Sequence, residues 1–131
     1  MSRYKAVITG ASKGIGADLA VRLLDRDYKV IAIDRETTTL SHENLQLIEA
    51  DLLDRATVAH VAGTLAADSG ITHLIHNAGL IWPNLLEDAS TEDIGGLAQL
   101  HLGSALQLMQ AVLPQMKAAN RRIDRSILNT A

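Results

Sequence analysis

Hydrophobic residues along this chain alternate between short apolar runs and longer stretches of helical periodicity. Apolar runs bounded by glycine or polar residues predict buried strands at Tyr4–Thr9, Tyr28–Ile33, Leu45–Glu49 and Ile71–Ile75. A fifth strand is predicted at Arg125–Asn129, close to the last residue. Because the strands alternate with helices, the pattern predicts βαβ units and an α/β fold with a doubly wound parallel sheet of about five strands.

Helical spacing of apolar residues predicts three helices among these strands. They run over residues 14–25, from a cap at Asp54 to about Ala67, and over a long stretch that begins near Ser90. We expect Pro114 to bend or end the long helix late in its course. One stripe of that helix is predicted to comprise Ile94, Leu97, His101, Ala105, Leu108, Val112 and Met116.

The composition is that of one globular domain over residues 1–131, with 47% hydrophobic and 21% charged residues. The absence of cysteine excludes disulfides and cysteine zinc sites, and a net charge of −3 argues against a nucleic-acid partner. No apolar run approaches the roughly 18 residues of a membrane span. The apolar stretch after Arg3 and Lys5 is too short for a signal peptide, so we expect a cytoplasmic protein.

A glycine-rich segment, Thr9–Gly16, joins the first predicted strand to the first helix and suits a phosphate-binding turn. Gly10 allows the positive φ of a tight turn, Gly14 allows a ligand to approach the backbone, and Gly16 allows the helix to pack closely. The N-terminus of the helix offers N–H groups to a pyrophosphate. Taken alone, the segment also fits a tight turn that binds nothing.

Asp34 ends the second predicted strand, where a carboxylate would accept hydrogen bonds from the ribose hydroxyls of a dinucleotide. The order of strand, glycine turn, helix, strand and acid indicates a dinucleotide-binding unit. A carboxylate at this position repels a 2′-phosphate, which favours NAD over NADP. Lys13 and Arg35 would instead attract that phosphate, so the choice of cofactor stays open, with NAD ranked first.

Together these motifs resemble the N-terminal half of the classical short-chain dehydrogenase/reductase family. Thr9–Gly16 resembles the family's TGxxxGxG, and Asn77-Ala78-Gly79 resembles the end of its NNAG, with His76 at the first Asn. Residues 111–116 and 127–131 resemble the end of its long fifth helix and the strand before its catalytic serine. The resemblance implies a Rossmann-like NAD(P) domain whose cofactor-binding residues are Gly10, Ser12, Lys13, Gly14, Ile15, Gly16, Asp34, Arg35, Asp51, Leu52, Asn77, Ala78 and Gly79.

The resemblance also implies hydride transfer between a nicotinamide and an alcohol or carbonyl, by a Tyr that a Lys four residues later activates. The only tyrosines are Tyr4 and Tyr28, followed four positions later by Ile8 and Ala32. We therefore expect the chain to be a half-domain, truncated before the sixth strand, that binds a dinucleotide weakly and is inactive. The other hypothesis is a non-catalytic binding or interaction module derived from the family, and the coding sequence after Ala131 separates the two.

Three histidines and one exposed sheet edge carry further expectations. His101 lies where the family usually has an Asn that orders a water, and we interpret it as a helix histidine without catalytic duty. His73 and His76 are three apart on a strand and point to opposite faces, so no metal site is predicted. An open fifth strand predicts a homo-oligomer through the Ile94–Met116 helix or the Arg125–Asn129 edge.

Overall fold

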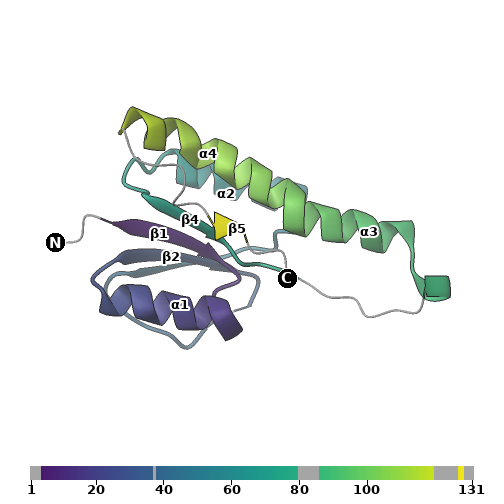
Figure 1. Cartoon of the computed structure of the whole chain (residues 1–131), viewed down its shortest axis with the longest axis horizontal. Helices are drawn as coiled ribbons and strands as arrows, with labels where there is room; N and C mark the ends of the chain where they lie inside the picture. The colour runs from purple at the N-terminus through teal and green to yellow at the C-terminus, as the bar shows by residue number, and fades with distance from the viewer. Residues whose placement is uncertain (1–3, 37, 80–85, 120–126, 129–131) are drawn as a thin grey trace.

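The computed structural model describes residues 4–36, 38–79, 86–119 and 127–128, and these form an α/β fold (Figure 1). Five parallel strands make one sheet in the order β3-β2-β1-β4-β5. The chain starts in the middle of the sheet, moves to one edge and then crosses to the other side, which confirms the predicted doubly wound topology. The strands are β1 Lys5–Thr9, β2 Lys29–Asp34, β3 Leu45–Glu49, β4 His73–His76 and β5 Ile127–Leu128.

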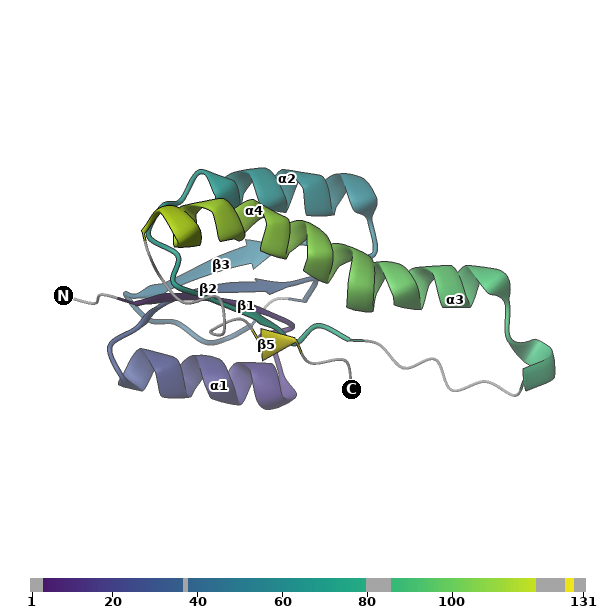
Figure 2. The same ribbon diagram turned by 45° about the horizontal axis from the view of Figure 1, so that its top comes forward.

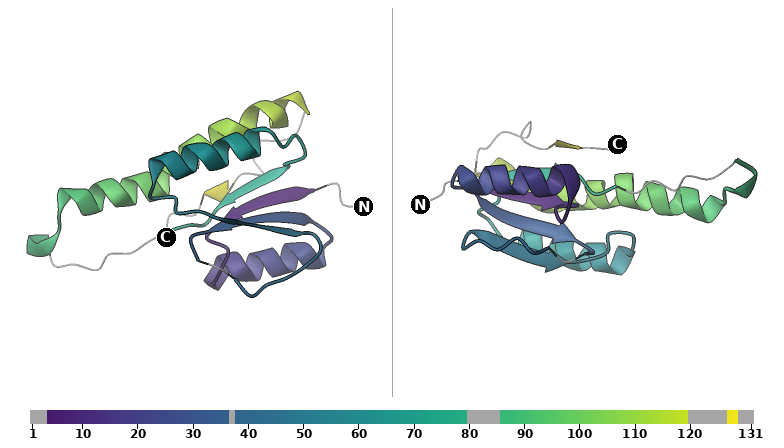
Figure 3. Two further views of the ribbon diagram at one scale, coloured as in Figure 1. Left: turned by 180° about the vertical axis from the view of Figure 1, so that it is seen from behind. Right: turned by 90° about the horizontal axis from the view of Figure 1, so that it is seen from below.

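Helices cover both faces of the sheet. Figure 2 shows α1 on one face and both α2 and α4 on the other, and Figure 3 shows α2 and α4 side by side. None of the helices among the described residues has the length and apolarity that a membrane span requires. The helical segments are α1 Gly14–Asp25, α2 Arg55–Ala66, the short η1 Leu86–Asp88, α3 Thr91–Ala98, the π-helical turn η2 Gln99–Gly103 and α4 Ser104–Ala118.

Two of the three helix starts that the sequence predicts have side-chain caps. Asp54 accepts hydrogen bonds from the backbone nitrogen of Ala56 at 3.3 Å and from the Thr57 hydroxyl at 2.7 Å. Ser90 and Asp93 form a reciprocal capping box in which each side chain bonds the other's backbone N–H. Such caps satisfy backbone donors that a helix leaves unpaired at its N-terminus.

Two apolar clusters fill the space between the sheet and the helices. The first lies between the sheet and the pair α2 and α4, and includes Leu65, Leu74, Leu108 and Met116. The second lies under α1 and includes Ile8, Ala20, Leu24 and Val30. Because both faces of a parallel sheet are buried, the interior positions of its central strands β1 and β2 are all apolar.

The long helix differs from the predicted single stripe. Ala105, Leu108, Val112 and Met116 are buried as expected, but Ile94 is 64% exposed. Two causes explain the difference: α3 extends beyond the sheet (Figure 2), and η2 changes the register of the helical faces. In η2 the Ser104 N–H bonds the Gln99 carbonyl, five residues back. Pro114 lies within the last turns of α4, which ends at Ala118.

The bounds of two strands also differ from the prediction. β4 begins at His73 rather than at Ile71. The Lys5 N–H bonds the Thr72 hydroxyl at 2.9 Å instead of a backbone carbonyl, so the backbone ladder with β1 is interrupted there. Of the predicted strand at 125–129, the structure describes Ile127 and Leu128, which pair with β4. The remaining residues of that prediction lie outside the described part of the chain.

Candidate functional site

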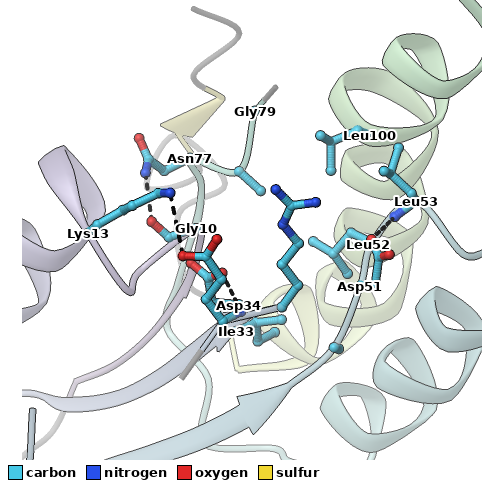
Figure 4. Close-up of a pocket in the computed structure, with 14 residues that line it drawn as sticks. Gly10, Lys13, Ile33, Asp34, Asp51, Leu52, Leu53, Asn77, Gly79 and Leu100 are labelled. Carbon is cyan, nitrogen blue, oxygen red and sulfur yellow. Dashed lines mark hydrogen bonds and ion pairs between the residues drawn. The ribbon is translucent and has the colours of Figure 1, made fainter. Parts of the chain in front are cut away.

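A cavity of about 240 Å³ opens at the carboxyl ends of β1, β2 and β4, where the order of the strands reverses (Figure 4). Ligands of open parallel sheets bind at this kind of switch point. Segments that directly follow four strands meet there. Its lining comprises Gly10, Lys13, Ile33, Asp34, Arg35, Glu36, Ala50, Asp51, Leu52, Leu53, Asn77, Ala78, Gly79 and Leu100.

The turn between β1 and α1 needs its glycines for two different reasons. Gly10 and Gly14 have φ values of 68° and 62°, in the left-handed region that side chains disfavour. Gly16 has no room for a side chain, since a Cβ there would overlap the Gly10 carbonyl and lie 2.6 Å from Asn77 Nδ2. No side chain caps the N-terminus of α1, which leaves that end suited to an anion.

Hydrogen bonds of Thr9 and Asn77 connect the loops that follow β1 and β4. The Thr9 hydroxyl accepts hydrogen bonds from the backbone nitrogens of Asn77 and Ala78, each at 3.0 Å. Asn77 Nδ2 donates to the Gly10 carbonyl at 3.1 Å. These bonds fix the floor of the cavity before any ligand enters. Thr9 was not among the predicted cofactor-binding residues, although its place directly before Gly10 is a usable signal.

Asp34 projects from the end of β2 into the cavity as an oriented carboxylate (Figure 4). Its Oδ2 accepts a hydrogen bond from Ser12 N at 3.0 Å and its Oδ1 accepts one from Glu36 N at 2.9 Å. Partial burial acts to raise the pKa of Asp34, but the hydrogen bonds from Glu36 and Ser12 outweigh it and hold the pKa below its ordinary value. A carboxylate has about four acceptor positions, and these two hydrogen bonds occupy one on each oxygen; the Ser12 side chain and the Arg35 backbone N–H also act to lower the pKa.

Two cationic side chains border this carboxylate. Lys13 and Arg35 both line the cavity. Lys13 Nζ lies 3.4 Å from Glu36 Oε2, so the ion pair crosses the mouth of the site beside Asp34. Glu36 was not among the predicted site residues, and the signal for it is an acidic residue two positions after Asp34. The ion pair offsets a charge that would otherwise attract a phosphate.

The other predicted cofactor-binding residues divide into two groups. Asp51, Leu52, Ala78 and Gly79 line the cavity, and Asp51 Oδ1 accepts a hydrogen bond from Leu53 N at 3.0 Å. The second group lies in the turn outside the cavity lining and comprises Ser12, Gly14, Ile15 and Gly16. Ile15 is 71% exposed at the start of α1.

The three histidines singled out by sequence have different surroundings. His101 lies in η2 and is half-buried. His73 packs edge-on against Tyr4 and at a tilt against Tyr28 at the amino ends of the strands, with ring centroids 5.7 and 5.6 Å apart. His76 is buried at the carboxyl end of β4. Among the described residues no group of three metal-ligating side chains comes together.

Known proteins match nearly the whole chain. A family model described as short chain dehydrogenase matches residues 4–131. Benzil reductase ((S)-benzoin forming) from Bacillus subtilis is 34% identical over 111 residues, covering 79% of this chain and 45% of the reductase. An uncharacterized short-chain type dehydrogenase/reductase, y4eK, from Sinorhizobium fredii is 33% identical over 120 residues, covering 88% of this chain and 48% of that protein.

A solved structure gives the same picture of the fold. A short-chain dehydrogenase from Sphingobium yanoikuyae in complex with NADPH superposes with a TM-score of 0.79 at 27% sequence identity. The match covers 90% of this chain and 50% of the other. This chain therefore spans about half the length of the curated relatives that it matches.

Proposed function

This chain belongs to the short chain dehydrogenase family, and we propose that it forms the adenine-binding half of an NAD(P)-dependent oxidoreductase acting on alcohols or carbonyls. The observation that carries the proposal is that the Gly10 turn, Asp34 and the segment 77–79 meet at one cavity. The relatives' names support this activity class, since they include a benzil reductase and a dehydrogenase in complex with NADPH.

The described residues fit a dinucleotide at its adenine end. The uncapped start of α1 would bind the pyrophosphate through backbone N–H groups, as helix N-termini bind phosphates. Asp34 would accept hydrogen bonds from the ribose hydroxyls with the acceptor positions that Ser12 and Glu36 leave open. Asp51 and Leu52 would border the adenine ring. The nicotinamide at the other end of the dinucleotide supplies the hydride in this class of reaction.

The affinity of this half for the whole dinucleotide should be low. We expect a dissociation constant for NAD no tighter than about 1 mM, near −4 kcal/mol, because only the adenine half meets a preorganised site. Isothermal titration calorimetry with NAD measures the constant directly. A micromolar constant would contradict the proposal that the adenine half alone is bound.

We propose that NAD is preferred over NADP for two reasons. The Asp34 carboxylate repels a 2′-phosphate, and the ion pair with Glu36 offsets the positive charge of Lys13 that would attract one. Glu36→Gln should free Lys13 and strengthen binding of 2′,5′-ADP relative to 5′-AMP by about twofold to fivefold. This range corresponds to the roughly 0.4–1 kcal/mol of an exposed ion pair. Chemical-shift titrations with the two nucleotides measure the ratio.

Glu43→Gln is the matched control for this ratio, because Glu43 is exposed and lies outside the cavity lining. It should leave the ratio unchanged. An unchanged ratio in Glu36→Gln as well would show that the ion pair has no part in cofactor choice.

We also propose that the chain self-associates through the exposed side of its long helix. Ile94, Leu102 and Leu106 are 64%, 61% and 56% exposed, and the last two lie one helical turn apart. Sedimentation velocity at tens of micromolar should show a dimer or larger species, and the double variant Leu102→Glu/Leu106→Glu should be a monomer. Val21→Glu, on the exposed side of α1, is the control that should still associate. A monomeric unmodified chain would contradict the proposal.

The alternative of a non-catalytic binding or interaction module uses the same adenine site, and the two differ in what is encoded after Ala131. A Tyr-x-x-x-Lys roughly a dozen residues further on favours the enzyme, and its absence favours the module. A cytoplasmic location is our proposal for either, since the chain holds no cysteine.

A further inference from the structure

His76 joins two elements that border the cavity. It lies at the carboxyl end of β4 with 2% of its surface exposed. Its Nδ1 lies 3.0 Å from the Thr9 hydroxyl, and its Nε2 lies 3.0 Å from the Leu100 carbonyl in η2. Both ring nitrogens are therefore engaged, one toward β1 and one toward the long helix. We call this set the Thr9–His76–Leu100 clamp.

The partners of the ring determine where its hydrogen lies. A carbonyl only accepts hydrogen bonds, so His76 Nε2 must donate to Leu100. The Thr9 hydroxyl oxygen already accepts from the N–H groups of Asn77 and Ala78, so its own hydrogen is directed to His76 Nδ1. The clamp therefore requires a neutral imidazole with its hydrogen on Nε2.

Burial lowers the pKa of His76, and the nearby His101 lowers it further, while the bond to Leu100 acts in the opposite direction. The net pKa lies below the ordinary value of 6.5, so the ring stays neutral at pH 7. At pH values above 6.5 the neutral ring and its two hydrogen bonds contribute fully to the stability of the folded state. The contribution falls as the pH drops below 6.5, since the unfolded chain then binds the proton first.

Leu100 gives the clamp its connection to the cavity. The Leu100 carbonyl accepts a second hydrogen bond, from the Ser104 hydroxyl at 2.5 Å. The Leu100 side chain lines the cavity opposite the segment that Thr9 holds. Two side-chain donors thus converge on one carbonyl within the π turn. The position of this cavity wall therefore depends on a bond from β4.

We propose that His76 is a positioning residue of the nucleotide site, which holds η2 and its Leu100 at the distance from the β1 and β4 loops that the adenine half requires. This inference rests on the proposed function, because it deepens the account of the same cavity. The residue acts through Leu100 and Thr9 and does not itself line the cavity.

Two substitutions separate the two ends of the clamp. An asparagine amide reaches the position of imidazole Nδ1, so His76→Asn keeps a partner for Thr9 and loses the donor to Leu100. A glutamine amide reaches the position of Nε2, so His76→Gln keeps that donor. A residue that merely filled space would respond to both changes alike, whereas a positioning residue is rescued by glutamine. His73→Asn, at the other end of the same strand, is the control.

The experiment is a chemical-shift titration of each variant with ADP-ribose, together with amide hydrogen exchange at Ser104 and Ala105. We expect His76→Asn to weaken ADP-ribose binding by about threefold to tenfold, as the loss of one buried hydrogen bond implies. It should also speed exchange in the helix next to η2. His76→Gln and His73→Asn should bind as the unmodified chain does. Equal binding by His76→Asn and the unmodified chain would overturn the inference.

A second measurement needs no ligand and no variant. Long-range ¹⁵N–¹H correlation spectra of the unmodified chain at pH 7 should show His76 as the neutral tautomer with hydrogen on Nε2. A charged ring or an Nδ1–H tautomer would overturn the clamp, even where His76→Asn does not fold. The unmodified chain could also bind no ADP-ribose although His76 shows the expected tautomer and His76→Asn speeds amide exchange as expected. The proposed function would then fail, and the clamp between β1, β4 and η2 would stand.

Discussion

The 131-residue chain should oxidise neither NADH nor NADPH when it is mixed with carbonyl compounds. Hydride transfer of this class needs a general acid close to the reacting oxygen, and the family's Tyr-x-x-x-Lys does not occur in the sequence. General acid–base catalysis typically contributes about 10²–10⁴-fold to a rate, so its absence is a large effect.

The two tyrosines that the chain does contain cannot serve this purpose. Tyr4 precedes β1, Tyr28 precedes β2, and their rings stack with centroids 5.2 Å apart. The cavity lies at the opposite ends of these strands. A strand of five residues spans roughly 16 Å at about 3.3 Å per residue, which no tyrosine side chain bridges.

The assay follows the absorbance of the reduced nicotinamide with a panel of aldehydes and ketones. A purified full-length member of the family, measured in the same buffer, shows that the panel and the detection work. The expected result is a rate equal to the background without protein. Turnover that scales with the concentration of the chain and disappears in a Gly10→Ala variant would contradict the prediction.

Gly16→Ala should be among the most destabilising single substitutions in the described part of the chain. The added Cβ would overlap the Gly10 carbonyl and lie 2.6 Å from Asn77 Nδ2 and 2.9 Å from the Gly10 carbonyl carbon. Two of these atoms belong to backbone that the turn fixes, so neither can rotate away. Overpacking costs about 1–3 kcal/mol, and we expect a loss in the free energy of unfolding of about 3 kcal/mol, measured by urea denaturation.

Gly63→Ala is the matched control for this prediction. Gly63 lies in α2, and a Cβ there would meet no atom within 4 Å. The same chemical change should therefore stabilise the protein by up to about 1 kcal/mol, the difference between the helix propensities of the two residues. Similar unfolding midpoints for the two variants would show that the turn does not have the close packing described.

The arrangement of strands and helices was predictable because its signals are local. The apolar runs of β1 and β2, and the caps Asp54 and Ser90, each act within a few residues of the chain. The family resemblance was predictable for the same reason, since its glycine motif occupies one short segment. The prediction failed at Ile94, because the extent of the sheet beneath α3 is not encoded near that residue.

The parts of the site that the sequence did not reveal depend on contacts between distant residues. The bond between Thr9 and His76 joins positions 67 residues apart. The π turn η2 arises where Leu100 meets a histidine 24 residues away, which no periodicity of the helix indicates. The ion pair between Glu36 and Lys13 likewise joins residues that are separated in the sequence and meet only in the folded turn. Asp34, by contrast, was identified from its place at the end of a strand.

The most direct test of the central claim is a titration of the ¹⁵N-labelled chain with ADP-ribose and then with NAD. The adenine half of a dinucleotide site should give saturable shifts at the amides of Gly10, Ser12, Asp34, Leu52 and Ala78. NAD should produce the same pattern with no tighter binding, because the nicotinamide adds no contact with a preorganised site. Absence of saturable shifts at these amides would contradict the account, as would shifts confined to the opposite ends of the strands.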